Sequence, residues 1–301
     1  MTSLILILIS ALFFNGIIGR VKSISAGRKG PGIMQPVKDV IRLFHKGAVY
    51  SDVTGPVFKA APAVYLASVL IACLCVPFGN KPGLISFSGD FVFFAYALAL
   101  GKFFCIIGAL DTGSSFEGMG ASREATYSML AEPAFFLIMG SLALMTGHSS
   151  FQDIFANLHP SSPMSWALAV IAIFIFLILA MVENSRMPVD DPKTHLELTM
   201  IHEVMVLDNS GIDLGLIFVT GYLKFAMYAA LIANLLIGSI PVGYGIPVFL
   251  AVQAVCAVII GLNESFSARF RMNHNPQFIF TLACIALLAV FGVMLMSGQL
   301  A

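Results

Sequence analysis

The sequence predicts an all-α, polytopic membrane protein with about eight transmembrane helices. Two observations support this fold class. The 301 residues are 58% hydrophobic and only 11% charged, whereas soluble domains carry roughly 25% charged residues. Apolar runs close to the length of about 20 residues that crosses a bilayer also recur from one end of the chain to the other. We therefore expect a single integral membrane domain, and the zero net charge offers no argument for binding nucleic acid.

The apolar runs define eight predicted spans, separated by segments that contain Gly, Pro or charged residues. No cleavable signal peptide is expected, because the apolar start lacks a basic segment before it. The spans are placed at residues 3–21, 60–79, 91–110, 127–146, 164–183, 214–237, 242–262 and 277–298.

Lysine and arginine are distributed unequally between the two sides of the membrane. The loops after the first, third, fifth and seventh spans hold thirteen of them, and the opposite loops hold Lys81 alone. Basic residues are enriched in cytoplasmic loops. We therefore expect those four loops to be cytoplasmic and, since the number of spans is even, both termini to lie outside.

The first cytoplasmic loop contains a predicted amphipathic helix at residues 36–47. Pro36 suits the first position of a helix, and Val37, Val40, Ile41 and Phe44 share one face at helical spacing. This pattern is typical of a helix at the membrane interface. It predicts either a simple surface anchor or a helix that also supports a partner subunit.

The second cytoplasmic loop, residues 110–125, is rich in Gly, Ser and Asp and is predicted to be irregular. Glu132 follows inside the fourth span, next to Pro133, which is expected to kink the helix. A carboxylate within a span costs at least about 2.5–3.5 kcal/mol when placed centrally, so such residues usually face a polar interior and have a function. The alternative is a structural Glu132 held by hydrogen bonds.

Two lysines are also predicted to lie within the membrane. Lys102 is central in the third span, too deep for its ammonium group to reach the surface, and Lys224 lies about ten residues into the sixth. Each either forms an ion pair that joins helices or belongs to a functional site. Glu132 is a candidate partner.

Residues 183–213 contain seven of the sixteen acidic residues and two of the six histidines. Asp191 before Pro192 predicts a helix start, and the helix should run to about Leu207. Asp191, His195 and His202 would then share one stripe, but the two histidines would be about 10 Å apart along the axis, too far to bind one metal ion. With no cysteine pair at metal-binding spacing either, no metal site is predicted. The remaining readings are a solvated loop or a proton or ion route, since chains of Asp, Glu and His form membrane proton relays.

Four motifs, in order, resemble the NADH dehydrogenase subunit 1 family, the membrane subunit shared by respiratory complex I and the membrane-bound [NiFe] hydrogenases. The resemblance covers nearly the whole chain, and the hydrogenase branch fits better because His195 replaces a glutamate typical of complex I and the segment before Ser210 is longer. The motifs are RKGPG (28–32) with Gln35 and Asp39, LDTGSSFEGMGASREA (110–125) followed by Glu132-Pro133, ENSRMPVDDP (183–192) with THLEL (194–198), and Ser210-Gly211.

The resemblance implies a subunit of the prokaryotic cytoplasmic membrane without a cofactor of its own. It would anchor a hydrophilic arm carrying [NiFe] and iron–sulfur clusters and couple its redox chemistry to proton or sodium movement. The implied partners are hydrogenase large and small subunits, a ferredoxin-like iron–sulfur subunit and antiporter-like membrane subunits. The alternatives are the quinone-site subunit of an NADH dehydrogenase and, less favoured because no internal repeat is seen, a free-standing ion transporter.

Site residues are predicted on both grounds. By resemblance, the coupling candidates are Glu132, Glu183, Arg186, Asp190, Asp191, Glu197 and Asp208. From the residues alone, Lys102, Lys224, His195, His202 and Glu203 are added. Candidates for docking a partner are Arg28, Lys29, Gln35, Asp39, Arg123, Arg269 and Arg271.

Overall fold

The computed structural model describes residues 1–158, 163–190, 200–238 and 240–296, and every regular element in this part of the chain is a helix. Eight of these helices are long and apolar enough to cross a membrane, as predicted. They are α1 (Thr2–Ser25), α3 (Pro56–Cys75), α4 (Asp90–Asp111), α5 (Ser115–Thr146), α7 (Pro163–Glu183), α9 (Gly211–Ile237), α10 (Val242–Phe266) and α11 (Asn275–Met296). The short elements are α2 (Gln35–Phe44), α6 (Phe151–Asn157), α8 (His202–Met205) and the 3-10 turn η1 (Met272–His274).

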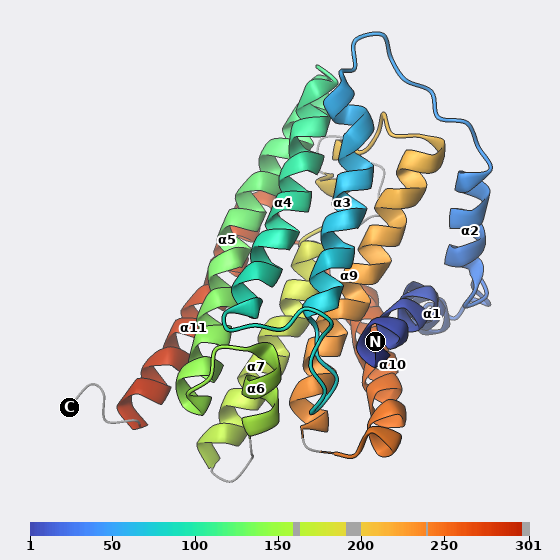
Figure 1. Cartoon of the computed structure of the whole chain (residues 1–301). Coiled ribbons are helices and arrows are strands. Elements are labelled where there is room, and N and C mark those ends of the chain that lie inside the picture. The colour runs from blue at the N-terminus through green and yellow to red at the C-terminus, as the bar shows by residue number, and fades with distance from the viewer. Residues whose placement is uncertain (159–162, 191–199, 239, 297–301) are drawn as a thin grey trace.

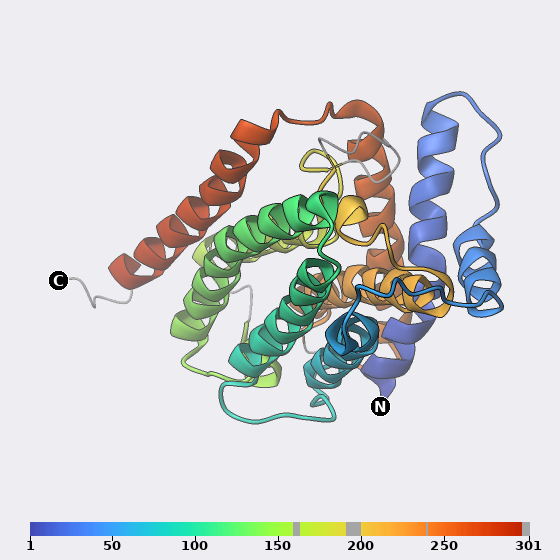
Figure 2. The same ribbon diagram turned by 90° about the horizontal axis from the view of Figure 1, so that it is seen from above.

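The bundle is organised around α9, which packs against α1, α3, α7 and α10 (Figure 1). The other extensive packings join α3 to α4, α5 to α11 and α1 to α10. Viewed from above, α1 and α2 lie on one side of the bundle and α11 on the other (Figure 2). Because α9 is largely enclosed by its neighbours, a charged residue on it must find its partners inside the protein.

Helix α2 forms where the amphipathic pattern predicted it. It starts at Gln35 with Pro36 in its first turn and ends at Phe44. Val40 is its buried residue, and the helix packs against α9 and α1. Of the predicted apolar stripe, Val37 and Val40 face the bundle, whereas Ile41 and Phe44 are exposed.

The prediction of an irregular second loop is wrong, because α5 begins at Ser115 and only residues 112–114 separate it from α4. A small residue in this segment, Gly120, allows α8 to pack closely against α5. A Cβ atom at Gly120 would lie 2.5 Å from Val204 Cγ1, so only glycine lets α8 approach α5 this closely. Tertiary packing thus outweighs the low helix propensity of glycine.

The predicted helix to about Leu207 is also wrong in the described part of the chain. Met200 and Ile201 are not helical, and α8 ends at Met205. The Asp190 carboxylate accepts hydrogen bonds from the backbone N–H groups of Ile201 (3.1 Å) and His202 (3.4 Å). These bonds hold the chain in a turn. A longer helix would need the same N–H groups for its own backbone hydrogen bonds. Asp191, His195 and Glu197, and with them the predicted stripe, lie outside the described residues.

Candidate functional site: a buried ion network

Four charged side chains from four helices meet inside the bundle. Lys102 Nζ on α4 lies 2.9 Å from Glu124 Oε1 on α5 and 2.9 Å from Glu183 Oε2 at the end of α7. Lys224 Nζ on α9 lies 2.8 Å from the same Glu183 oxygen. We call these four residues the quartet. When all four are ionised their formal charges cancel.

The quartet is shielded from the surroundings. Exposed fractions of the side chains are 8% for Lys102, 4% for Glu124, 12% for Glu183 and none for Lys224. Lys224 also donates hydrogen bonds to the Tyr65 hydroxyl and to the Glu183 backbone carbonyl, both at 3.3 Å. Since an unpaired buried charge is strongly destabilising, each lysine requires its carboxylate partners.

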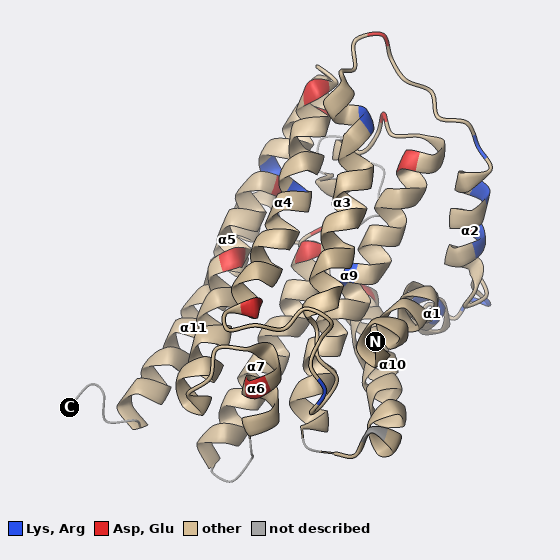
Figure 3. Ribbon diagram, viewed as in Figure 1, with Lys and Arg blue, Asp and Glu red and all other residues tan. Residues whose placement is uncertain are grey.

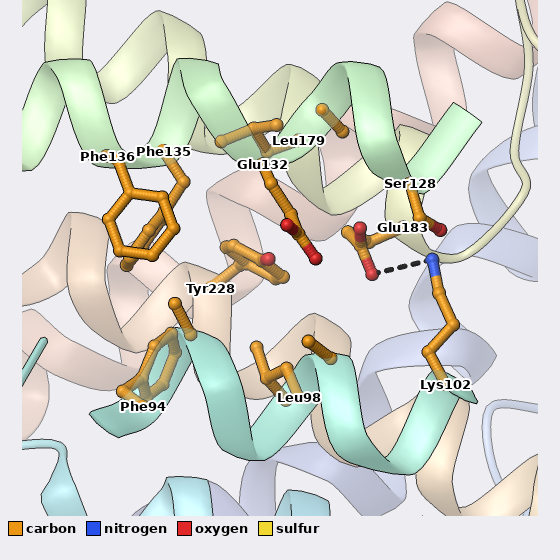
Figure 4. A pocket seen from close by; sticks show the side chains of 13 residues that line it. Phe94, Leu98, Lys102, Ser128, Glu132, Phe135, Phe136, Leu179, Glu183 and Tyr228 are labelled. Carbon is orange, nitrogen blue, oxygen red and sulfur yellow. Dashed lines mark ion pairs between the residues drawn. The ribbon is translucent and has the colours of Figure 1, made fainter. Parts of the chain in front are cut away.

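The candidate pairing of Lys102 with Glu132 is wrong, because Lys102 binds Glu124 and Glu183 instead. Glu132 lies two turns further along α5, and among the described residues it forms no hydrogen bond or ion pair. Its side chain and that of Glu183 extend into one pocket, which Lys102 reaches from α4 (Figure 4). The pocket has a volume of about 30 Å³, enough for about one or two water molecules.

A second cavity of about 150 Å³ opens on the other side of Glu183. Its wall includes Arg186, Asp190, His202 and Glu203, together with Tyr65 and Tyr222. Glu183 is the residue that lines both cavities. The carboxylate bound by both lysines therefore lies between two spaces large enough for water.

Arg186 belongs to a further ion cluster at this end of the bundle. Its guanidinium donates to Glu264 Oε1 (3.1 Å) and to Asn15 Oδ1 (2.8 Å). Lys22 Nζ lies 2.8 Å from the other Glu264 oxygen. These contacts join α1, α10 and the segment after α7. They place Glu264 close to residues 183–213.

Asp190 and His202 line the second cavity from one segment. Asp190 Oδ1 lies 2.7 Å from Arg269 Nη2, so this predicted coupling residue pairs with a predicted docking residue. Burial lowers the pKa of the His202 imidazole by penalising its charged form, and the nearby Glu124 carboxylate opposes this shift. His202 is therefore uncharged at neutral pH.

The last described coupling candidate, Asp208, takes part through its backbone. Its N–H donates to Glu117 Oε1 at 2.8 Å, while its side chain is exposed. Glu117 is a buried carboxylate in the first turn of α5. This contact ties the end of the acidic segment to α5 and brings Asp208 no nearer to the quartet.

The docking candidates fall into two groups. Arg28, Lys29 and Arg271 are exposed. The others have partners within the chain: Gln35 donates to Asp39 (2.8 Å), Arg123 donates to the Met200 carbonyl (2.9 Å), and Arg269 pairs with Asp190.

Sequence reasoning missed Glu124 and Tyr65 as members of the network. Glu124 lies just before the predicted fourth span, so the sequence places it in a polar loop. Since α5 begins nine residues earlier, at Ser115, Glu124 is within the helix and faces Lys102. Had residues 115–126 been predicted as a helix, Glu124 would have been placed within the fourth span. In the part of the chain that the structure describes, no three His, Cys, Asp or Glu residues are grouped closely enough to bind a metal ion.

The fold and the quartet define a class: a polytopic membrane protein that holds an ion network among its helices. Charged positions are few in the lower half of the bundle and more frequent in its upper half (Figure 3). A family model described as NADH dehydrogenase matches residues 1–296. The chain therefore belongs to the NADH dehydrogenase subunit 1 family, as the sequence motifs predicted.

Individual relatives are subunits of hydrogenase and NADH dehydrogenase-like membrane complexes. The chain is 32% identical to hydrogenase-4 component C of Escherichia coli over 71% of its own length, and 31% identical to formate hydrogenlyase subunit 4 of the same organism over 57%. It is 26% identical to a subunit of the NADH-quinone oxidoreductase of Methylococcus capsulatus over 70%. The chain covers 66%, 56% and 66% of the lengths of these three relatives.

One solved structure shares the fold over almost the whole chain. A chain of the membrane-bound sulfane sulfur reductase, an archaeal respiratory membrane complex, superposes with a TM-score of 0.80, covers 96% of each chain and is 18% identical in sequence. At this identity the likeness establishes the fold only.

Proposed function

We propose that this chain is the membrane-anchoring and ion-coupling subunit of a complex I-like enzyme of the membrane-bound [NiFe] hydrogenase type. It seats a hydrophilic arm that carries the [NiFe] centre and iron–sulfur clusters, and it links electron transfer in that arm to movement of protons or sodium ions. Its partners are hydrogenase large and small subunits, a ferredoxin-like iron–sulfur subunit and antiporter-like membrane subunits. The kinship with hydrogenase-4 component C and formate hydrogenlyase subunit 4 supports this assignment.

The observation that favours coupling is the position of Glu183 between two cavities, bound by Lys102 and Lys224. A charge that changes in the cavity beside Arg186 and His202 alters the free energy of protonating Glu183. At a separation of 4 Å, two unit charges interact by about 4 kcal/mol at an effective dielectric constant near 20. Such a perturbation is large enough to shift a proton between carboxylates.

The ionic links continue on the other side of Glu183. Lys102 binds Glu183 and Glu124 at once, so a change at one carboxylate alters the pairing of the other. Glu132 shares the small cavity with Lys102 and Glu183 and forms no ion pair with a described residue. The chain of groups therefore runs from the second cavity towards the middle of α5.

The test replaces Glu132 by Gln in the assembled complex in inverted membrane vesicles. We expect electron transfer and assembly to persist while ion uptake per electron is lost, because Gln keeps the size of the side chain but does not bind a proton. Asp153→Asn, a matched change at an exposed carboxylate in α6, serves as the control and should pump like the wild type. Normal pumping by Glu132→Gln would refute the coupling role.

The second candidate is the quinone-site subunit of an NADH dehydrogenase, favoured by one feature. A largely apolar cavity of about 200 Å³ lies between α1, α2, α3 and α9, and Tyr222 lines both this cavity and the one beside Arg186. The first space suits an apolar group, such as part of an isoprenoid tail, and the second suits a polar head group. Gene neighbourhood separates the two functions: a nickel-binding large subunit encoded nearby supports the hydrogenase, and a full set of NADH-oxidising subunits supports the alternative.

A further inference from the structure

Tyr228 lies on α9 one helical turn beyond Lys224 and lines the small cavity beside Glu132. Residues four positions apart share one face of a helix, so Tyr228 extends into the bundle on the same side as the lysine that binds Glu183. The side chains of Tyr228, Glu132 and Glu183 enter this cavity from three different helices (Figure 4). The tyrosine therefore borders the ion network, although no sequence pattern identified it.

The Tyr228 hydroxyl has no hydrogen-bond partner among the described residues. The residue is only 4% exposed, and a buried tyrosine hydroxyl usually has a partner because an unsatisfied one is costly. Its oxygen is accessible to a water molecule, unlike sealed unpaired atoms elsewhere in the bundle such as Gln253 Oε1. The cavity is therefore the place where this hydroxyl can be satisfied.

Other polar groups at the cavity also have unused hydrogen-bonding capacity. Glu132 forms no hydrogen bond or ion pair with a described residue. A lysine ammonium has three donors, and Lys102 directs two of them to Glu124 and Glu183. The Ser128 hydroxyl donates to the Glu124 carbonyl at 2.9 Å, which leaves its oxygen able to accept. Donors and acceptors thus face the same small space.

The cavity matches a water molecule in size and in polarity. Its volume is about 30 Å³, which holds one or two waters, and a bound water needs two to four polar partners. The rest of the wall includes Phe94, Leu98 and Phe135, so the polar groups are set in apolar surroundings. Because the Lys102 ammonium group is positively charged and lines the same space, a neutral molecule suits the cavity better than a sodium ion.

We propose that Tyr228 holds a water molecule against Glu132 in the small cavity, and that this water passes protons between Glu183 and Glu132. No hydrogen bond joins these two described carboxyl groups directly, so transfer between them needs a bridge. The water accepts a proton from one carboxyl group and donates one of its own to the other carboxylate, so it remains a neutral water. Tyr228 is a positioning residue, because its hydroxyl donates to the water oxygen and turns the water hydrogens towards the carboxylates. The transfer role rests on the proposed function, whereas the water site does not.

The first test is a cryo-electron microscopy map of the complete wild-type complex, at a resolution that shows ordered water. We expect density within about 2.5–3.2 Å of both Tyr228 Oη and a Glu132 carboxyl oxygen, the range of ordinary hydrogen bonds. The same density should be lost in Tyr228→Phe, which keeps the ring and removes the hydroxyl. A direct bond between Tyr228 and Glu132, a metal ion in the cavity, or density that remains in Tyr228→Phe would overturn the proposal.

A spectroscopic test measures the hydrogen bonding of Glu132 itself. The carboxyl C=O band of Glu132 is identified in pH-difference infrared spectra as the band that Glu132→Gln removes. Tyr228→Phe should shift this band, because the bound water no longer donates to the carboxyl group. Tyr127→Phe is the matched control: it removes another buried hydroxyl, one that accepts a hydrogen bond from Asn275 at 3.5 Å, and it should leave the band in place. An unshifted band in Tyr228→Phe would contradict the water bridge.

Ion uptake per electron in inverted vesicles then separates the water site from the coupling role. We expect Tyr228→Phe to lose uptake while electron transfer persists, and Tyr127→Phe to pump like the wild type. If the density and the band respond to Tyr228→Phe but Glu132→Gln pumps normally, the water site stands and the coupling role fails. If Glu132→Gln abolishes uptake while Tyr228→Phe changes neither the band nor the uptake, the water bridge is wrong and the coupling role stands.

Discussion

Replacing Glu183 by Gln should destabilise the protein more than any other single conservative change in the ion network. Glu183 is the shared partner of Lys102 and Lys224, at 2.9 and 2.8 Å. Gln would leave two buried ammonium groups with Glu124 as their remaining carboxylate, a net charge of +1 in the quartet. Removing one partner of a buried ion pair costs about 3–5 kcal/mol.

This cost converts into a measurable shift of the unfolding midpoint. For chains of some 150–250 residues, 1 kcal/mol shifts the midpoint by about 2–4 °C, so we expect a decrease of roughly 6–20 °C. The protein contains its own reporters, since Cys73, Cys75, Cys105 and Cys256 are buried and become reactive when the bundle opens. A thiol-reactive fluorophore in detergent therefore measures the transition above the constant signal from the exposed Cys284.

A second substitution tests whether charge causes the loss. The double variant Glu183→Gln/Lys224→Gln returns the quartet to neutrality, so it should be more stable than Glu183→Gln alone, and the double-mutant cycle should show a coupling energy of at least about 0.5 kcal/mol. If Glu183→Gln unfolds at the wild-type temperature, or if the double variant is no better than the single one, the electrostatic account of the quartet is refuted.

Two further outcomes are expected. Reversal of charge at the exposed residues Arg28 and Lys29 (R28E/K29E) should release the hydrophilic arm from membranes, measured by sedimentation and immunoblotting; if the arm stays bound, these residues report only topology. His202 should make the protein sensitive to acid: its folded-state pKa is lowered by burial from 6.5, so the folded state binds fewer protons than the unfolded state and loses stability as the pH falls below about 6.5. His202→Gln should reduce the difference between midpoints measured at about pH 7.5 and about pH 5.5, and an unchanged difference would contradict this assignment.

Hydropathy was sufficient to predict the membrane fold. The bilayer requires about 20 apolar residues per crossing, and this local condition predicted all eight spans. The helical spacing of apolar residues predicted the amphipathic α2. Placing a charged side chain in the hydrocarbon core costs free energy, so a charge inside a span is unusual whatever surrounds it. For this reason the sequence alone also identified Lys102, Glu132 and Lys224 as candidate site residues. These conclusions depend only on short stretches of sequence and on the apolar character of the bilayer core.

The pairing of those charges depended on contacts between distant segments. Lys102 and Glu124 are close in sequence but meet only because α5 starts at Ser115, and Glu183 joins Lys102 to Lys224 across three helices. The early start of α5 arises from the packing of Gly120 against Val204, a contact between residues more than eighty positions apart. Composition favours a loop there, whereas burial of that surface favours a helix. Tertiary packing also decided that the Glu132 side chain extends into the pocket that Lys102 and Glu183 line.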